Sequence, residues 1–282
     1  MRASIHIITR DRVNSLAVLL GSLCTQTTKD FDIVILDNGR NVKVGQDHMC
    51  GAALRRLQLE GVRVHLVESK AEHRDIGAYR NECVNSDPFN NQIGIRIDDD
   101  SLLEPNYIEI LVNGFTEPDI GVVGGIVPYI FVPKTYILQP AKFNEITSDY
   151  DWVDNCVTFV RFINDDGKDL HYQATYFPSG HIRSSYAYRM DLAKKIRFPE
   201  WSGFTGFTEE TVFCIKVWMN GYKVLINPNA VAWHYSIPGG GGRDKVVSQA
   251  QIDKIKTDNL ARLKVELDLY RASVKAERRG YP

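Results

Sequence analysis

The first half of this 282-residue chain alternates short apolar runs with amphipathic stretches, and this alternation constrains the fold more than any other feature. The apolar runs have the length of strands, and between them apolar residues recur at helical spacing. Such alternation favours right-handed crossovers and a mostly parallel sheet, and therefore predicts an α/β protein. The expected strands are residues 4–9, 31–36, 62–67, 93–97 and 120–127, and the expected helices are residues 13–26, with Asp11 or Asn14 near its start, 48–59, 76–85 and 105–115.

The pattern changes after residue 127. Several segments now alternate and carry many aromatic residues, with no long helix between them, which indicates a mixed or antiparallel part of the molecule. These segments are residues 153–162, 172–177 and 182–188. A helix is expected from Thr208 to about Asn220, where Gly221 ends it. Two short strands, residues 222–226 and 230–234, are expected around the turn Asn227-Pro228-Asn229.

Four glycines, Gly239 to Gly242, precede the C-terminal stretch and predict a flexible joint. A helix is expected beyond them, from about Val246 to Arg278. Its apolar residues form a seam at helical spacing that must pack on the domain or on a second copy of the chain. A homodimer through this helix is therefore one expectation. The seam residues are Leu260, Leu263, Leu267, Tyr270 and Val274.

Composition and charge exclude several classes of protein. A hydrophobic content of 44% with 24% charged residues is typical of a globular domain, and a net charge of −1 predicts no general attraction to nucleic acid. The five cysteines are scattered and never spaced as C-x-x-C, which argues against a disulfide framework or a zinc site and fits a reducing compartment. No signal-peptide core follows Met1, and no apolar run reaches the ~20 residues of a membrane span. We expect a cytoplasmic protein, with a membrane-peripheral location left open because basic residues outnumber acidic ones after Arg243.

Three consecutive carboxylates, Asp98, Asp99 and Asp100, end the apolar run of residues 93–97. Ligands of open α/β sheets bind beyond the carboxyl ends of the strands. Mg²⁺ and Mn²⁺ prefer carboxylate oxygens and commonly bind through one or two of them plus substrate phosphates. A solvated acidic turn is the alternative, because Asp is common after strands. The triplet by itself leaves both interpretations open.

Five stretches, in this order, resemble the family 2 group of GT-A fold glycosyltransferases, and the resemblance runs from about residue 4 to residue 235. The first stretch is residues 5–9 followed by residues 16–26, which end in a Leu-x-x-Gln-Thr element. The others are residues 31–39 ending in Asp37-Asn38-Gly39, Gly77-Ala78-Tyr79-Arg80-Asn81-Glu82, the D-x-D motif Asp98-x-Asp100 before Pro105, and residues 206–221 with Glu209-Glu210 at the front. The resemblance implies a GT-A fold: a Rossmann-like nucleotide-binding half with a mostly parallel central sheet, an acceptor-side mixed or antiparallel sublayer, and a C-terminal helical extension.

The same resemblance implies the division of the chain. Residues 1–237 would form the glycosyltransferase domain, with residues 1–128 as the nucleotide-sugar-binding half and residues 129–237 as the acceptor-side half. Residues 238–282 would then be the glycine hinge and the C-terminal helix.

The activity implied is metal-dependent transfer of a sugar from a UDP- or GDP-linked donor to a hydroxyl of a glycan, a lipid-linked or another acceptor. The cofactor would be Mn²⁺ or Mg²⁺, which acts as a Lewis acid on the diphosphate. Asp100 would be the direct ligand, and Asp98 and His234 would complete the metal shell. A histidine at a strand end can instead be a simple hydrogen-bonding partner.

Glu210 matches the family's general base, and Glu209 would bind acceptor hydroxyls or orient the loop. The family usually has Glu-Asp here, and relatives on the same fold that retain the anomeric configuration have Glu-Asn. We expect an inverting enzyme, with a retaining transferase and a non-catalytic nucleotide- or glycan-binding module as the alternatives. Alternatively, acidic residues in a first helical turn can simply interact favourably with the helix dipole, without a catalytic role. A nucleotidyltransferase is disfavoured because residues 9–14 contain no glycine.

The remaining implied site residues fall into two groups. Asp37 would accept hydrogen bonds from the base, or else only organise its turn. Arginines suit bidentate phosphate contacts, and Arg243 could close over the diphosphate as part of a lid. The nucleotide-binding group comprises Thr9, Arg10, Asp37, Arg74, Arg80, Asp98 and Asp99. The group for the donor or acceptor sugar comprises His181, Trp201, Gly206, Phe207 and Arg243.

Overall fold

The computed structural model describes residues 1–69, 75–130, 184–201 and 209–235. It also describes residues 177–178, 182 and 237, and part of the stretch from residue 250 to residue 272.

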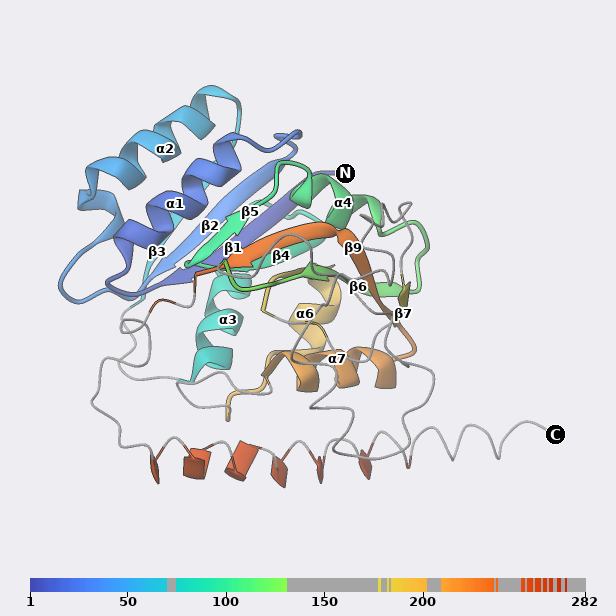
Figure 1. The fold of residues 1–282 in the computed structure, drawn as a ribbon. Coiled ribbons are helices and arrows are strands. Elements are labelled where there is room, and N and C mark those ends of the chain that lie inside the picture. The colour runs from blue at the N-terminus through green and yellow to red at the C-terminus, as the bar shows by residue number, and fades with distance from the viewer. Residues whose placement is uncertain are drawn as a thin grey trace, which may run out of the picture.

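A mixed sheet forms the centre of the molecule, and helices cover both of its faces (Figure 1). The strands are β1 (Ala3–Thr9), β2 (Phe31–Asp37), β3 (Val64–Glu68), β4 (Ile93–Asp98), β5 (Ser101–Leu103), β6 (Ile120–Ile126), β7 (Phe177–Pro178), β8 (Tyr186–Arg189) and β9 (Lys223–His234). The helices are α1 (Val13–Cys24), the short 3-10 helix η1 (Val44–Gln46), α2 (His48–Leu59), α3 (Ile76–Asn85), α4 (Tyr107–Asn113), α6 (Met190–Ile196) and α7 (Glu209–Met219). The strand order is β3-β2-β1-β4-β8-β6-β9-β5, with β7 paired to β9.

The N-terminal half is the parallel α/β unit that the alternation predicts. Strands β3, β2, β1 and β4 are all parallel, and their register places Thr9 opposite Asp37 and Ile8 opposite Asp98. The carboxyl ends of β1, β2 and β4 therefore meet at one edge of the sheet, where ligands of such sheets bind.

Both faces of the parallel strands are buried, which explains why their sequences are almost continuously apolar. Ile5 and Ile7 of β1 pack against the leucines of α1 and α2. On the opposite face, Val34 and Leu36 of β2 pack against α3, and β8 packs against α6 and α7. Figure 1 shows α1 and α2 on one side of the sheet and α3, α6 and α7 on the other.

The antiparallel part belongs to the same sheet. Strand β8 lies between β4 and β6 and is antiparallel to both. It corresponds to the expected segment 182–188, and it leads directly into α6, a helix that the aromatic pattern did not predict. The expected segment 153–162 and most of 172–177 lie outside the described residues.

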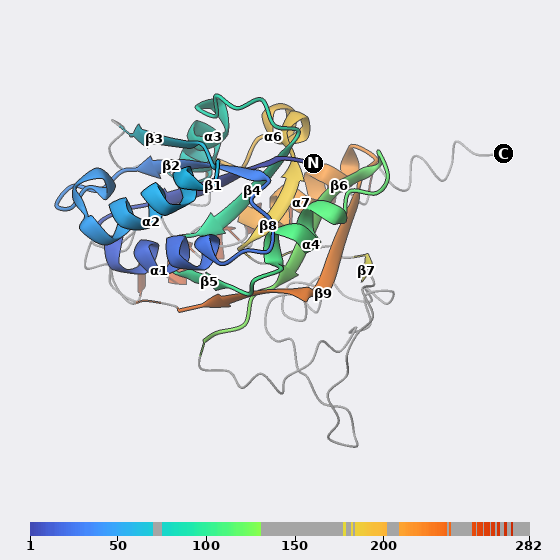
Figure 2. The same cartoon turned by 90° about the horizontal axis from the view of Figure 1, so that it is seen from above.

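The helix expected to start at Pro105 begins at Tyr107 instead, after the Asn106 N-cap. The residues before it are recruited to the sheet, because Ser101 to Leu103 form β5 and pair antiparallel with the end of β9 (Figure 2). A turn closed by the N–H of Tyr107, which donates to the carbonyl of Glu104 at 3.0 Å, then separates strand from helix.

The two short strands expected around Asn227-Pro228-Asn229 are one strand, β9, with a bulge. Ile226 pairs with Gly124 and Val231 with Ile126, so that residues 227–230 lie opposite Gly125 alone. A Cβ on Gly125 would lie 2.1 Å from the carbonyl oxygen of Ala230, and only glycine permits this approach. The bulge lets β9 continue along the sheet to His234.

The described residues between 250 and 272 are helical, as the sequence predicts. The seam residues all lie outside the described residues, so pairing of two chains through the seam stays a prediction. Among the described residues, no helix combines the length and the apolar character that crossing a bilayer requires.

Gly77 lets the first turn of α3 pack directly on the backbone of Pro199, because an added Cβ would lie 1.8 Å from the Pro199 carbonyl oxygen. We expect Gly77→Ala to lower the free energy of unfolding by about 1–3 kcal/mol, since α3 or the segment around Pro199 must shift. Urea denaturation measures the change. The matched control is Gly21→Ala in α1, where a Cβ meets nothing within 4 Å, and it should raise the free energy by about 0.5–1 kcal/mol. The same destabilisation in both variants would contradict the prediction.

Candidate functional site

Asp98 ends β4 at the ligand-binding edge of the sheet and is held by two buried arginines. Nη2 of Arg80 in α3 donates to its Oδ1 at 2.5 Å, and Nη2 of Arg96 lies 3.6 Å from the same oxygen. Burial by itself would raise the pKa of this carboxyl, but the two guanidinium groups outweigh it and lower the pKa to about 2. Asp98 is therefore an anion throughout the neutral range.

Asp99 turns toward the end of β1. Its Oδ2 accepts a hydrogen bond from the Thr9 hydroxyl at 2.8 Å, and Nη1 of Arg12 donates to its Oδ1 at 3.2 Å. Burial raises the pKa of Asp99 to about 6, against the effect of Arg12. Thr9 and Asp99, both expected near the nucleotide, thus contact each other.

Asp98, Asp100 and His234 form a cluster of potential metal ligands. Each offers one ligand atom, and these atoms lie within 4.8 Å of one another. Nε2 of His234 is 3.2 Å from Oδ1 of Asp100. The pairing of Ser101 with His234 in β5 and β9 brings the histidine to the end of β4. Two carboxylates and an imidazole form a donor set that suits Mn²⁺, and the carboxylates suit Mg²⁺.

Arg12 is a site residue that the sequence reasoning missed. Its guanidinium contacts Asp99, lies 3.4 Å from Oδ2 of Asp100, and donates to the carbonyl of Ile237 at 3.2 Å. It links the acidic strand end to the chain that precedes the glycine joint. Its position in the first loop after β1 is the only signal in the sequence, because nothing local indicates which carboxylates it meets.

Two aspartates organise the loops that follow β1 and β2. Asp11 has a positive φ of 53°, which Asp tolerates better than most residues, and its Oδ1 accepts three backbone N–H groups, from Arg40, Asn41 and Val42. Asp11 lies near the start of α1, as the sequence predicts, but the N-cap of this helix is Arg12, without a side-chain cap. Oδ1 and Oδ2 of Asp37 accept from the N–H groups of Gly39 and Val44, both at 2.8 Å. Asp37 thus organises its turn, and its contact with a base stays a prediction.

Glu209 and Glu210 begin α7 and differ in environment. Glu209 is 1% exposed, and its Oε1 accepts from Nη1 of Arg96 at 2.8 Å. The side chain of Glu210 is 17% exposed, and its Oε1 lies 3.4 Å from Nη2 of the same arginine. Burial raises the pKa of Glu209 to about 7, while Arg96 acts in the opposite direction. Of these two glutamates, Glu210 is the one that is both accessible to solvent and close to the Arg96 guanidinium.

Trp201 precedes α7 and contacts the C-terminal helix. The guanidinium of Arg262 lies over its ring, 5.4 Å from the centroid. Trp201 is also one of the residues expected to contact the donor or acceptor sugar. Arg10 follows β1 and is half-buried. Five expected site residues lie outside the described residues, namely Arg74, His181, Gly206, Phe207 and Arg243.

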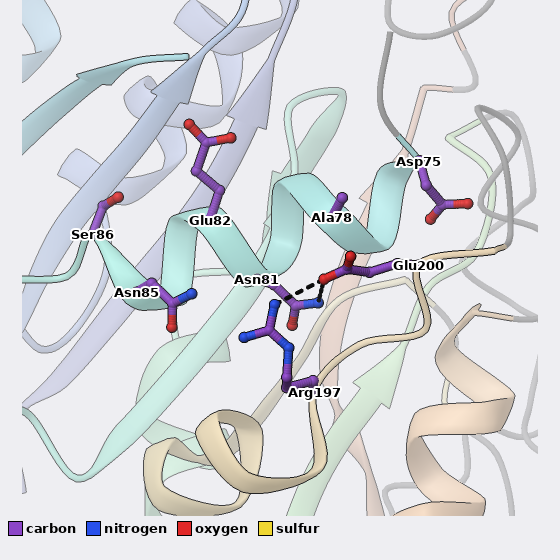
Figure 3. A pocket seen from close by; sticks show the side chains of 8 residues that line it. All are labelled: Asp75, Ala78, Asn81, Glu82, Asn85, Ser86, Arg197 and Glu200. Carbon is purple, nitrogen blue, oxygen red and sulfur yellow. Dashed lines mark hydrogen bonds and ion pairs between the residues drawn. The ribbon is translucent and has the colours of Figure 1, made fainter. Parts of the chain in front are cut away.

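A groove of about 540 Å³ lies between α3 and the segment that leads to Trp201 (Figure 3). Oε1 of Glu200 accepts from Asn81 and from Arg197, both at 2.8 Å, as the dashed lines in Figure 3 show. These bonds fix the segment against α3. The lining residues are Asp75, Ala78, Asn81, Glu82, Asn85, Ser86, Arg197 and Glu200.

Asp98 stabilises the fold as well as forming part of the site, because it balances two buried guanidinium groups. Its folded-state pKa of about 2 lies below the unfolded value of about 3.9, so this stabilisation is complete above about pH 4 and is lost as the pH falls through about 2. We expect Asp98→Asn to lower the free energy of unfolding by about 2 kcal/mol at pH 7 and pH 5, and by less at pH 3. Urea denaturation with a chelator present measures this. Asp30→Asn, at an exposed position, is the control and should change the free energy by less than about 0.5 kcal/mol at each pH. A difference for Asp98→Asn that grows toward pH 3 would refute the assignment.

The architecture is similar to several solved structures. S. aureus TarS in complex with UDP-GlcNAc matches with a TM-score of 0.60 and 15% identity, over 94% of this chain and 66% of that chain. GalNAc-T7 with UDP, GalNAc and Mn²⁺ matches with a TM-score of 0.67 and 16% identity, over 96% of this chain and 50% of that one. The mannosyltransferase PcManGT from Pyrobaculum calidifontis, in complex with GDP-Man and Mn²⁺, matches with a TM-score of 0.55 and 13% identity, over 100% of this chain and 76% of that one.

These likenesses establish the fold, which is the expected GT-A fold. The chain spans 37% of the TarS chain in a further structure and 66% in the UDP-GlcNAc complex, less than two thirds in both cases. No curated protein sequence matches it. The family model for glycosyl transferase family 2 matches residues 4–197, which is more than half of the chain. The chain therefore belongs to glycosyl transferase family 2.

Proposed function

We propose that this protein is a metal-dependent glycosyltransferase that moves a sugar from a UDP- or GDP-sugar to an acceptor hydroxyl and inverts the anomeric centre. The observation that carries the proposal is the cluster of Asp98, Asp100 and His234 at the ligand-binding edge of a GT-A sheet, beside an accessible Glu210. Family membership supports the reaction class. The TarS, GalNAc-T7 and PcManGT structures hold UDP-GlcNAc, UDP with GalNAc, and GDP-Man, which supports the proposed donor, and the last two also hold Mn²⁺, which supports the proposed metal.

The donor would bind at the carboxyl ends of β1, β2 and β4. Asp98, Asp100 and His234 would hold Mn²⁺ or Mg²⁺, which when bound would stabilise the negative charge of the departing diphosphate. Arg80 keeps Asp98 ionised and oriented, so that the ligand is ready without rearrangement. Thr9, Arg10, Asp37, Arg74 and Asp99 are proposed to border the nucleotide.

Glu210 is proposed as the general base. A base must accept a proton from the acceptor hydroxyl, and this requires access and an ionised carboxylate near neutral pH. Glu210 is partly exposed, and Nη2 of Arg96 lies 3.4 Å from its Oε1. Glu209 is fully buried against Arg96 and would orient the start of α7 rather than exchange protons with substrate. Attack in line with the departing diphosphate from the Glu210 side would invert the anomeric centre.

Other parts of the proposal concern the acceptor and the rest of the chain. Trp201, with His181, Gly206 and Phe207, would contact the donor or acceptor sugar, and Arg243 would close over the diphosphate. The acceptor would be a glycan, a lipid-linked or another hydroxyl compound. We also propose that the chain divides into residues 1–128, 129–237 and 238–282. A homodimer through the C-terminal helix and a cytoplasmic location are further parts of the proposal.

The metal role predicts that UDP and GDP bind poorly in the absence of a divalent cation, because diphosphate and carboxylates repel each other. We expect at least about tenfold tighter binding with Mn²⁺ than with a chelator, measured by calorimetric titration. Asp100→Asn should abolish most of this gain, whereas Asp191→Asn, at an exposed position in α6, should leave it intact. Equal affinity with and without the cation would remove the metal role of Asp100.

The base assignment predicts that Glu210→Gln lowers turnover on the order of 10²-fold or more, while UDP or GDP with Mn²⁺ still binds, because the amide keeps the shape but accepts no proton. Release of nucleoside diphosphate from a panel of donors measures turnover, and NMR of the product should show the inverted anomer. Glu209→Gln should lower turnover less, by about tenfold. Normal turnover of Glu210→Gln with an inactive Glu209→Gln would move the base by one residue. A retained anomeric configuration would refute the base mechanism itself.

A further inference from the structure

Arg96 is a charged residue in the middle of an otherwise apolar buried strand. It lies in β4 between Ile95 and Ile97, and it is 2% exposed. Side chains alternate between the faces of a strand, so Arg96 shares the face of Asp98, two residues further on. A buried guanidinium is costly unless carboxylates and hydrogen bonds compensate it, so its partners indicate what it does.

The partners of Arg96 come from both sides of the proposed reaction centre. Nη1 donates to Oε1 of Glu209 at 2.8 Å, and Nη2 lies 3.4 Å from Oε1 of Glu210. The same Nη2 lies 3.6 Å from Oδ1 of Asp98, the proposed metal ligand. One amino group thus lies between the carboxylate proposed as the base and a carboxylate of the metal cluster.

The remaining contacts fix the orientation of the guanidinium. Tyr186 of β8 lies directly opposite Arg96 in the sheet. The guanidinium carbon lies 5.1 Å from the centroid of the Tyr186 ring, and Nη1 is 3.5 Å from its hydroxyl. Glu209 and Tyr186 therefore fix the orientation of the planar guanidinium group of Arg96. In this orientation Nη2 faces Glu210 and Asp98. A lysine has the same charge but a single amino group, so it could not contact Glu209, Glu210 and Asp98 in this way.

We propose that Arg96 is a positioning residue that couples the two halves of the reaction centre, so that Glu210 is held in register with the cation-binding carboxylate Asp98. This inference rests on the proposed function, because it assigns Glu210 and Asp98 the roles given above. In this role Arg96 acts through the carboxylates that it holds.

A neighbouring arginine provides a matched comparison. Arg80 is also buried, at 5% exposure, and it also contacts Asp98, but no described contact joins it to Glu209 or Glu210. If Arg96 acts through the base, Arg96→Lys should lower kcat by about 30-fold or more and change the affinity for UDP with Mn²⁺ by less than about threefold. Arg80→Lys should instead weaken the binding of UDP with Mn²⁺ by about tenfold or more.

Combination with Glu210→Gln tests the route of the effect. Once the base is removed, its positioning no longer matters, so Arg96→Lys in the Glu210→Gln background should lower kcat by less than about threefold. Arg80→Lys in that background should keep its full effect on UDP binding. Thermal melting of each variant checks the fold. If Arg96→Lys does not fold, Glu209→Gln takes its place, because it removes the charge of the main partner of Arg96. Its loss of kcat should be about tenfold, should spare the affinity for UDP with Mn²⁺, and should not add to that of Glu210→Gln.

The outcomes separate this inference from the proposed function. An active wild-type enzyme whose Arg96→Lys variant keeps its kcat, or loses donor affinity as Arg80→Lys does, would overturn the positioning role alone. The positioning role would also be overturned if the fold-losses of kcat caused by Arg96→Lys and Glu210→Gln multiply fully in the double variant. Such a result would show that Arg96 and Glu210 act independently. A wild-type protein that releases nucleoside diphosphate from no UDP- or GDP-sugar in the panel would overturn the proposed function and this inference together.

Discussion

The structure of the site depends on the pairing of buried charges at one edge of the sheet. Carboxylates from the end of β4 and the start of α7 surround guanidinium groups that come from three different elements. Neither set could be buried alone, because an isolated buried ion is far more costly than a paired one. The carboxylates outnumber the guanidinium groups, and the proposed divalent cation would balance part of the excess negative charge. The members are Asp98, Asp99, Asp100, Glu209 and Glu210 with Arg12, Arg80 and Arg96.

The sheet provides the frame that makes this pairing possible. The register of the parallel strands brings the ends of β1, β2 and β4 together, so that Thr9 meets Asp99 and the loop held by Asp37 lies beside them. The bulge in β9 then carries His234 to β5, next to Asp100.

Local patterns predicted much of this frame. The strands and helices of the first half are where apolar periodicity indicates them, because both faces of a parallel sheet must be apolar and each helix must bury one stripe. The D-x-D motif and the Glu pair were identified through their resemblance to motifs of family 2 glycosyltransferases. The errors fall where pairing with a distant strand overrides local preference. Ser101 to Leu103 form a strand because β9 lies beside them, and the turn at Asn227 becomes a bulge because β6 continues past it.

By itself the sequence determined the fold class, the acidic strand end and the residue types available for metal binding and proton transfer, since each depends on short-range spacing. Only the tertiary structure decided how these residues are placed relative to one another. Glu209 and Glu210 are adjacent and chemically equivalent in sequence, yet one is buried against Arg96 and the other remains accessible. Arg96 and Glu209 are 113 positions apart, and Arg12 lies 88 positions before Asp100. Contacts of that separation depend on how strands and helices pack in three dimensions, and no local pattern encodes them.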